Sequence, residues 1–235
     1  MSKTLANLRA QTRTYLDEAV QADWTDTEVD REINSSYLKL YTAAVAVYED
    51  YYSVKAQSHS TALTQEYALP SNFWKMRRVE INYKPSSSDS VPQRALPESI
   101  DSVFKQLSSS VSTVGVMGNP AYYLRGNNIG FLPVPTETTT TGTKPITIWY
   151  IKTITELSAA GDEIDIPFAD RYAFIISLDA AGTLLRKGQQ EETAARGYLA
   201  EADVERDKMA QELEDRVADD SKKIIDTQGD DMDFS

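Results

Sequence analysis

The sequence predicts an α+β chain, mainly α, in which a helical bundle carries an inserted small antiparallel β region and ends in an extended C-terminal tail. Apolar residues recur at helical spacing near both ends of the 235-residue chain, the middle alternates apolar and polar residues as strands do, and the last residues lack a continuous pattern. We therefore divide the chain into helices at 1–57, a β-rich insertion with mobile loops at 58–166, helices at 167–217 and a tail at 218–235.

Composition excludes several classes of protein. Hydrophobic residues make up 41% and charged residues 26%, which is typical of a globular chain. The net charge of −12 argues against nucleic-acid or anionic-lipid binding through the whole surface. No apolar run approaches the ~20 residues that span a bilayer, and the N-terminus lacks the apolar core of a signal peptide. We expect no membrane partner and a start in a cytoplasm.

The N-terminal segment predicts two helices. Leu5 and Leu8 begin an apolar stripe at helical spacing. Thr25 followed by Glu28 forms a capping box that starts the second helix. The helical spacing of apolar residues continues to about Lys55, which predicts a helix of roughly thirty residues, longer than most.

Strand-like alternation marks the middle of the chain, and Gly126-Asn127-Asn128 between two such runs predicts a hairpin turn. Alternation along Lys75–Tyr83 places Met76, Arg78, Glu80 and Asn82 on one face and Arg77, Val79, Ile81 and Tyr83 on the other. The adjacent basic residues Arg77 and Arg78 then lie on opposite faces. We therefore interpret them as surface charges next to a turn and not as a nucleic-acid-binding patch. A short helix is predicted near Ser99, and the threonine-rich stretch 136–143 is predicted to be a mobile loop.

Two further helices are predicted after the insertion. Pro167 suits a first helical turn, and Gly188 suits a C-terminal cap. Between them the pattern is apolar nearly all round, as in a buried central helix, and Ala180-Ala181-Gly182 would let another helix approach closely. The last predicted helix runs from Glu191 to Val217.

The C-terminal tail carries apolar residues within an acidic segment. Residues 191–235 have a net charge of −9, against −3 for residues 1–190. A solvated tail is one interpretation. The other is a segment that orders on a partner protein, with four apolar side chains as its anchors: Ile224, Ile225, Met232 and Phe234.

No pattern in the sequence indicates catalysis. Without cysteine the chain has no thiolate metal site or thiol nucleophile. The single histidine, His59, has no nearby ligands and is a weak candidate for a base or a metal site. Asp162, Glu163 and Asp165 could serve a carboxylate-dependent hydrolase, but a turn that leads into a helix cap explains them. We expect no catalytic, cofactor-binding or metal-binding residues.

The order of these segments resembles the head-to-tail adaptor proteins of tailed bacteriophages, including the tubular tail proteins of short-tailed phages. The resemblance covers nearly the whole chain and rests on the order and spacing of four stretches: "LRAQTRTYLDE…WTDTEVDREINSSYLKLY", "YALPSNFWKMRRVEI", "NPAYYLRGNNIGFLPVP" and "DIPFADRYAFIISLDAAGTLL", the last leading into "ETAARGYLAEADVERDKM".

The resemblance implies a virion structural protein, made in the host cytoplasm and assembled as a homo-oligomeric ring of twelve copies below the portal. Its C-terminal segment, 218–235 here, would dock on the portal protein. The β region would face the next tail component, a tail or nozzle protein, and we assign that contact to Asn127, Thr139 and Thr140. DNA would pass through the lumen without specific binding.

Two other interpretations stay open at this point. A ring-forming tail-completion protein would share the composition and the β insertion but would bind the tail and not the portal. A hydrolase would need two acidic residues buried in one cleft with raised pKa values.

Overall fold

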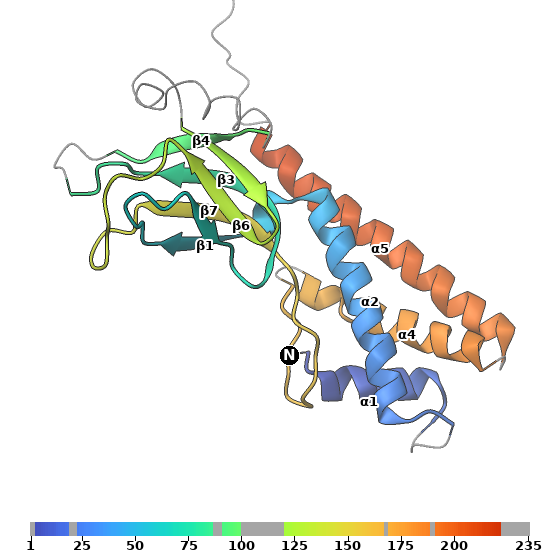
Figure 1. The fold of residues 1–235 in the computed structure, drawn as a ribbon. Coiled ribbons are helices and arrows are strands. Elements are labelled where there is room, and N and C mark those ends of the chain that lie inside the picture. Colours follow the sequence, from blue (N-terminus) through green and yellow to red (C-terminus); the bar gives the residue numbers. More distant parts are fainter. Residues whose placement is uncertain are drawn as a thin grey trace, which may run out of the picture. The chain divides into compact units, whose positions relative to one another are not determined.

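The computed structural model divides the chain into two compact units (Figure 1). A helical unit comprises Met1–Tyr51 and Ile154–Ser235, and a β unit comprises Tyr52–Thr153. The residues that the structure describes are 3–18, 23–86, 91–99, 120–166, 169–188 and 191–221.

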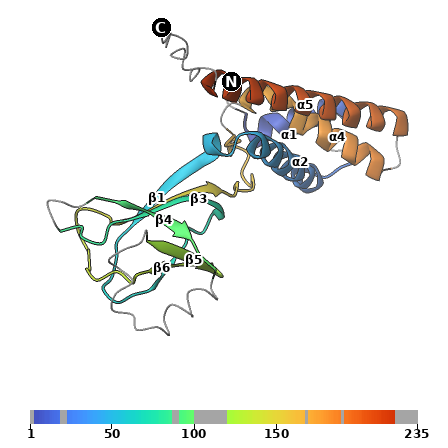
Figure 2. The ribbon, with the colours of Figure 1, turned by 90° about the horizontal axis from the view of Figure 1, so that it is seen from above.

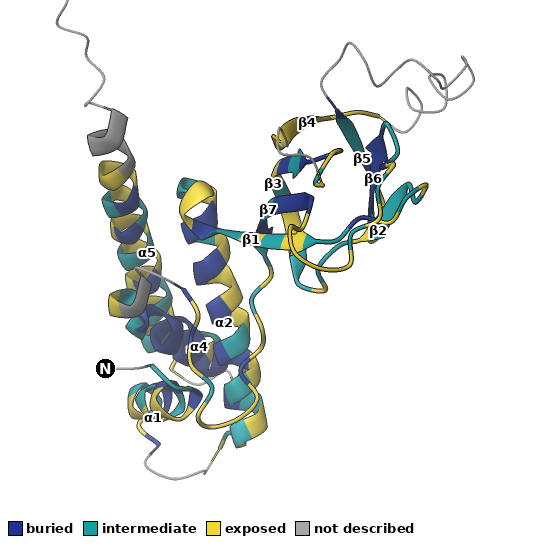
Figure 3. Cartoon of the chain, turned by 90° about the vertical axis from the view of Figure 1, so that its left-hand side faces the viewer, coloured by how far each residue is buried: buried dark blue, intermediate teal, exposed yellow. Residues whose placement is uncertain are grey.

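Four α-helices and two short 3₁₀ helices are described, and α4 lies at the centre of the helical unit. Side chains along nearly its whole length are buried (Figure 3), because α4 packs against α1, α2 and α5. This confirms the buried central helix that the apolar pattern predicts. The helices are α1 (Leu5–Tyr15), α2 (Asp26–Val47), η1 (Asp50–Tyr52), η2 (Ala169–Tyr172), α4 (Phe174–Lys187) and α5 (Glu192–Ser221).

The ends of α2 and α4 are set by local chemistry. The predicted capping box is present, since the side chains of Thr25 and Glu28 bond each other's backbone amides. However, α2 ends at Val47 and not near Lys55, because the following residues form η1 and then a strand. Gly188 caps α4 as predicted, and its amide donates to the Leu184 carbonyl at 2.9 Å. The helical turn predicted at Pro167 lies outside the described residues.

A buried carboxylate connects three helices of the helical unit. Asp179 of α4 is only 4% exposed. It accepts hydrogen bonds from Ser36 Oγ at 2.5 Å and Lys39 Nζ at 2.9 Å, both on α2, and Arg206 Nη2 of α5 lies 3.5 Å away. Arg206, which interrupts the apolar face of the last predicted helix, therefore supplies a counter-charge to this cluster.

The sheet corrects the predicted fold class. It has seven strands in the order β1-β7-β3-β4-β5-β6-β2, it curls into a half-barrel (Figures 1 and 2), and β4 and β5 run parallel. The protein is thus not a mainly helical bundle with a small antiparallel β region. Alternation predicts single strands but not their number or order, which depend on pairing between distant segments. The strands are β1 (Ser53–Ser58), β2 (Glu66–Ala68), β3 (Phe73–Ile81), β4 (Gln93–Pro97), β5 (Ala121–Arg125), β6 (Asn128–Leu132) and β7 (Ile146–Lys152).

A register shift in β3 changes the predicted faces of this strand. The pairing with β7 skips one residue between Met76 and Arg78. Met76 therefore packs against the same core as Val79 and Ile81, and not on the face of Arg78 as simple alternation predicts. A bulge of this kind inserts one extra residue into a strand, so the side chains beyond it point to the opposite faces from those that simple alternation predicts.

The predicted hairpin is confirmed between β5 and β6. Gly126 adopts φ +57°, which glycine tolerates, and Arg125 pairs with Asn128 across the turn. Further along this ladder a Cβ on Gly130 would lie 2.2 Å from the ring of Tyr123, so the ring lies directly over the glycine. Burial and a hydrogen bond to Glu66 raise the pKa of Tyr123 to about 12.

Within the described ranges, no helix has the length and apolar character needed to cross a membrane.

Gly182→Ala tests the close approach of α4 and α5 that the small residues predict. A Cβ there would lie 2.9 Å from Leu199 Cγ and 3.1 Å from the Ala195 carbonyl oxygen. We expect the substitution to lower the free energy of unfolding by about 1–2 kcal/mol despite the better helix propensity of alanine. Gly197→Ala on α5, where a Cβ meets nothing within 4 Å, should instead stabilise by about 0.5–1 kcal/mol. Urea unfolding would measure both, and equal effects would contradict the packing argument.

Asp179→Ala should leave Lys39 and Arg206 without their shared buried partner. We expect the free energy of unfolding to fall by about 3–5 kcal/mol, the usual cost of breaking a buried ion pair from one side. The matched control is Asp203→Ala, which removes an exposed carboxylate that also pairs with Arg206 and should change the value by less than about 1 kcal/mol. A small loss for Asp179→Ala in urea unfolding would show that the cluster is not required.

Candidate functional site

The groups considered for catalysis have structural partners. Asp162 Oδ2 accepts hydrogen bonds from the amides of Ser158 and Ala159, both at 2.7 Å, and these bonds lower the pKa of Asp162. The carboxylate therefore closes the turn at 158–162. His59 Nδ1 lies 3.2 Å from Thr139 Oγ1 in a shared hydrogen bond. Among the described residues, no group of three or more His, Cys, Asp or Glu could hold a metal ion.

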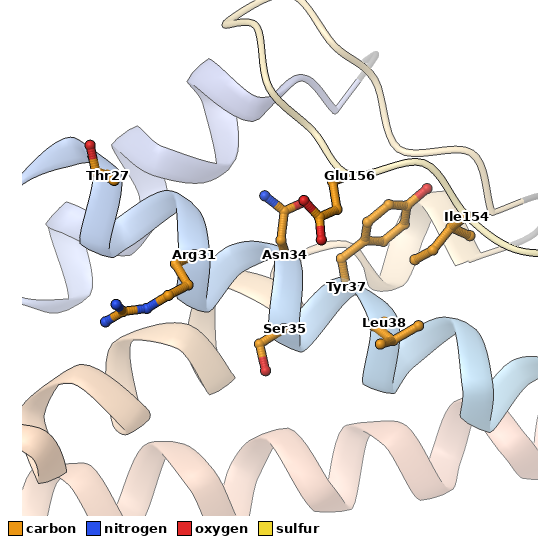
Figure 4. A pocket seen from close by; sticks show the side chains of 8 residues that line it. All are labelled: Thr27, Arg31, Asn34, Ser35, Tyr37, Leu38, Ile154 and Glu156. Atoms are coloured by element: carbon orange, nitrogen blue, oxygen red, sulfur yellow. The ribbon is translucent and has the colours of Figure 1, made fainter.

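A groove of about 540 Å³ lies along α2 in the helical unit (Figure 4). One wall is α2 itself, where Leu38 is 54% exposed. The other wall is the segment that contains Ile154 and Glu156. The lining has polar side chains toward one end and the apolar ones of Leu38 and Ile154 toward the other (Figure 4). The residues that line it are Thr27, Arg31, Asn34, Ser35, Tyr37, Leu38, Ile154 and Glu156.

Asn34 fixes the two walls of this groove. Its side-chain oxygen accepts from the Leu157 amide at 2.8 Å, and its side-chain nitrogen donates to the Leu157 carbonyl at 3.0 Å. Tyr37 adds a second connection, since its hydroxyl accepts from the Asp165 amide at 2.7 Å. The segment after the β unit is thereby bound to the side of α2 through its backbone.

A second groove, beside α1, is lined by two arginines that form ion pairs. Arg9 binds both carboxylate oxygens of Asp30, at 2.9 and 2.7 Å, and this hydrogen bonding raises the pKa of Arg9. Arg13 bonds Glu18 at 2.9 Å and Asp26 at 2.7 Å, and the hydrogen bond from Arg13 lowers the pKa of Asp26. These charges satisfy one another and join α1 to the start of α2, which is a structural role.

Two loops of the β unit are joined by hydrogen bonds. Ser60 and Thr139 exchange backbone and side-chain bonds of 2.9 and 3.1 Å. The amide of Ala62 donates to Thr138 Oγ1 at 2.8 Å, and the amide of Leu63 donates to the Pro135 carbonyl at 2.9 Å. The threonines that composition assigns to a mobile loop thus hold the neighbouring loop in place.

Leu63 projects from these joined loops. Its side chain is 86% exposed, and its backbone has φ +63°, which is uncommon for a residue other than glycine. Leu63 thus combines an exposed apolar side chain with an uncommon backbone conformation at the tip of the joined loops.

The residues assigned to the next tail component fall into two places. Asn127 lies in the turn that begins β6, and Leu69 next to it donates to the Asn127 carbonyl. Thr139 and Thr140 lie in the joined loops, near the other end of β6. The amide of Phe131, close to that end, donates to the carbonyl of Gln65, which follows the first of these loops. Five strand residues separate the two ends, about 15 Å. The portal anchors Ile224, Ile225, Met232 and Phe234 lie outside the described residues.

Sequence reasoning missed Leu38 and Leu63. Leu38 lies in the second predicted helix, where a step of one residue turns the side chain by about 100° and so decides whether it faces in or out. Leu63 carried a weak signal: a lone leucine between Ala62 and Thr64 in a polar stretch. Neither can be identified as exposed until the neighbouring segments are placed.

The comparison with known families decides what these surfaces belong to. The family model of the SU10 adaptor protein matches residues 3–223 of the 235. The chain belongs to the SU10 adaptor protein family. This is a family of phage head-to-tail adaptors, so the resemblance stated from the sequence is confirmed. No curated protein matches the chain.

Membership in the SU10 adaptor protein family makes the chain a phage adaptor and a component of the virion. An adaptor interacts with other proteins of the phage head and tail. The family is a structural one.

Asn34→Ala tests how the α2 groove is held. The substitution removes both hydrogen bonds to Leu157, each worth about 1 kcal/mol. We expect the Leu157 amide to exchange its hydrogen at least roughly tenfold faster, because local opening becomes easier. Ser35→Ala, at an exposed position in the same groove, should leave this exchange rate unchanged. Equal rates in the two variants, measured by NMR hydrogen exchange, would contradict the role of Asn34.

Proposed function

We propose that the chain forms the head-to-tail adaptor ring that joins the portal protein to the tail and forms part of the DNA channel. The match of the adaptor family over residues 3–223 carries this proposal. A ring of twelve copies would build head-to-tail contacts that close by rotation. The copies would be made in the host cytoplasm and would form this ring in the virion.

The C-terminal segment is the proposed portal contact. This segment carries apolar residues among acidic ones. When a segment becomes ordered on a partner protein, its apolar side chains can anchor it in a groove of that partner. The proposed anchors are Ile224, Ile225, Met232 and Phe234. Folding of this segment only on the portal would make assembly ordered, since copies would meet on their template.

The β unit is the proposed contact for the next tail component, a tail or nozzle protein. Asn127 at one end of β6, and Thr139 and Thr140 beyond the other end, stay the residues assigned to it. The exposed tip at Leu63 supports the second of these two places, because it adds an apolar side chain beside Thr139.

The charge of the chain suits a channel through which DNA passes without specific binding. A net charge of −12 per copy repels phosphates. In a ring this field acts from every subunit, so packaged DNA would not adhere to the wall.

Deletion of residues 218–235 tests the portal contact. The deletion starts beyond Leu213, which is buried in the helical unit, so we expect a folded monomer that no longer binds portal. Light scattering after size-exclusion chromatography, with and without purified portal, would measure this. A full-length control with serine at Ile224, Ile225, Met232 and Phe234 should lose binding in the same way if these side chains are the anchors. Retained portal binding after the deletion would refute the proposed contact.

A further inference from the structure

The two units of the chain carry opposite charge. The β unit has 10 Lys+Arg against 6 Asp+Glu, a formal charge of +4. The helical unit has 14 Lys+Arg against 30 Asp+Glu, a formal charge of −16. An acidic protein thus contains a basic module, and such asymmetry within one chain indicates a partner of complementary charge.

The basic charge of the β unit is organised around one tryptophan. Trp149 of β7 is the cross-strand neighbour of Lys55 on β1 and of Arg78 on β3. Lys55 Nζ lies 5.7 Å from the centre of the indole ring, and Arg78 Cζ lies 5.1 Å from it. Both cations therefore make cation–π contacts with one ring, which holds them on one face of the sheet. We call Lys55, Trp149 and Arg78 the basic row.

The positive charge of this row is only partly neutralised. Arg78 forms an ion pair with Glu80 on its own strand. Within the described ranges, neither Lys55 nor Arg94 forms an ion pair. Arg94 is the cross-strand neighbour of Glu80 in the β3–β4 ladder. From the sequence we rejected a basic patch at Arg77-Arg78, because we considered the faces of one strand only. The row is assembled from three strands that are distant in the sequence.

The exposed face of α5 has the complementary pattern. Glu201, Val204 and Asp207 follow one another at intervals of three residues, so neighbours in this series lie close together, and the two carboxylates lie about 120° apart around the helix axis, on either side of Val204. All three are exposed, Val204 by 53%. The face thus carries an exposed apolar residue between two carboxylates, and Lys208 nearby offsets part of the Glu201 charge.

The spacing of the two patterns also agrees. Glu201 and Asp207 are six residues apart, about 9 Å along a helix. Lys55 and Arg78 are two strand spacings apart, about 9.6 Å across a sheet. A helix that crosses the strands could therefore pair each carboxylate with one cation and place Val204 on the indole.

We propose that the basic row binds the Glu201–Asp207 face of α5 in a second copy of this chain. The proposal rests on the proposed ring, and it identifies one contact between neighbouring subunits. Copies that each carry −12 repel one another, and pairing of a positive module with a negative helix offsets this repulsion at the contact. The contact joins two different surfaces, so it is heterologous and generates a ring where its rotation closes. DNA is a poorer occupant, because the −16 helical unit of the same chain repels it.

Two charge-reversed variants test the contact between copies. Lys55→Glu/Arg78→Glu reverses the row, and Glu201→Lys/Asp207→Lys reverses the helix face. Each variant alone then opposes like charges, whereas a 1:1 mixture restores opposite charges at every contact of an alternating ring. Lys84→Glu/Lys144→Glu, at exposed positions of the β unit outside the row, is the control with the same change in net charge as the row variant.

Sedimentation velocity at low ionic strength, over a concentration series and without portal, would measure association. We expect each reversed variant to associate at least tenfold more weakly than the wild-type chain, the mixture to recover the wild-type constant, and the control to match wild type. Added salt should weaken the wild-type contact. A wild-type chain that stays monomeric over the whole concentration series, or a mixture that associates no better than its components, would overturn the proposal.

The same variants separate this proposal from its alternatives. If the row variant associates like wild type but no longer binds a double-stranded oligonucleotide that wild type binds, the row contacts nucleic acid and the proposal is wrong. If the mixture recovers association but wild type does not join the portal, the contact stands and the proposed adaptor function fails. The variants keep the far-UV circular dichroism of wild type if only surface charge has changed.

Discussion

The buried carboxylate of Asp179 is the constraint around which the helical unit is arranged. It lies on the central helix, and its partners come from α2 and α5, so the three helices must meet in one register to neutralise it. An apolar core alone tolerates sliding of one helix on another, whereas a buried charge left without partners is costly. Gly182 adds a steric limit on the packing of α4 against α5, since Leu199 and the Ala195 carbonyl of α5 occupy the space that a side chain there would need.

Periodicity in the sequence predicted what depends on neighbours in the chain. The capping box at Thr25, the hairpin at Gly126 and the cap at Gly188 are local, and all three are confirmed. The length of α2 was wrong, because strand pairing with β7 takes the residues that helical spacing assigned to it. The sheet was underestimated for the same reason, since its order joins β1 to β7 and β2 to β6 over long stretches of chain.

The candidate surfaces were harder to predict than the elements that carry them. Exposure of Leu38 and Leu63 depends on which segments pack beside them, and sequence spacing does not give that. The basic row needs a register shift in β3 and two pairings with β7 before Lys55 and Arg78 meet at one ring. The family was predicted from the order of the segments along nearly the whole chain, because no single motif identifies it, and the family match covers residues 3–223.

The strands through which the chain enters and leaves the β unit are partners in the sheet. Ser53 at the start of β1 pairs with Ile151 near the end of β7, so the two crossings from one unit to the other are one strand spacing apart, about 5 Å. An insertion whose ends meet in this way replaces little more than a tight turn of its host. The β unit can therefore be replaced as a whole while the chain path of the helical unit is retained.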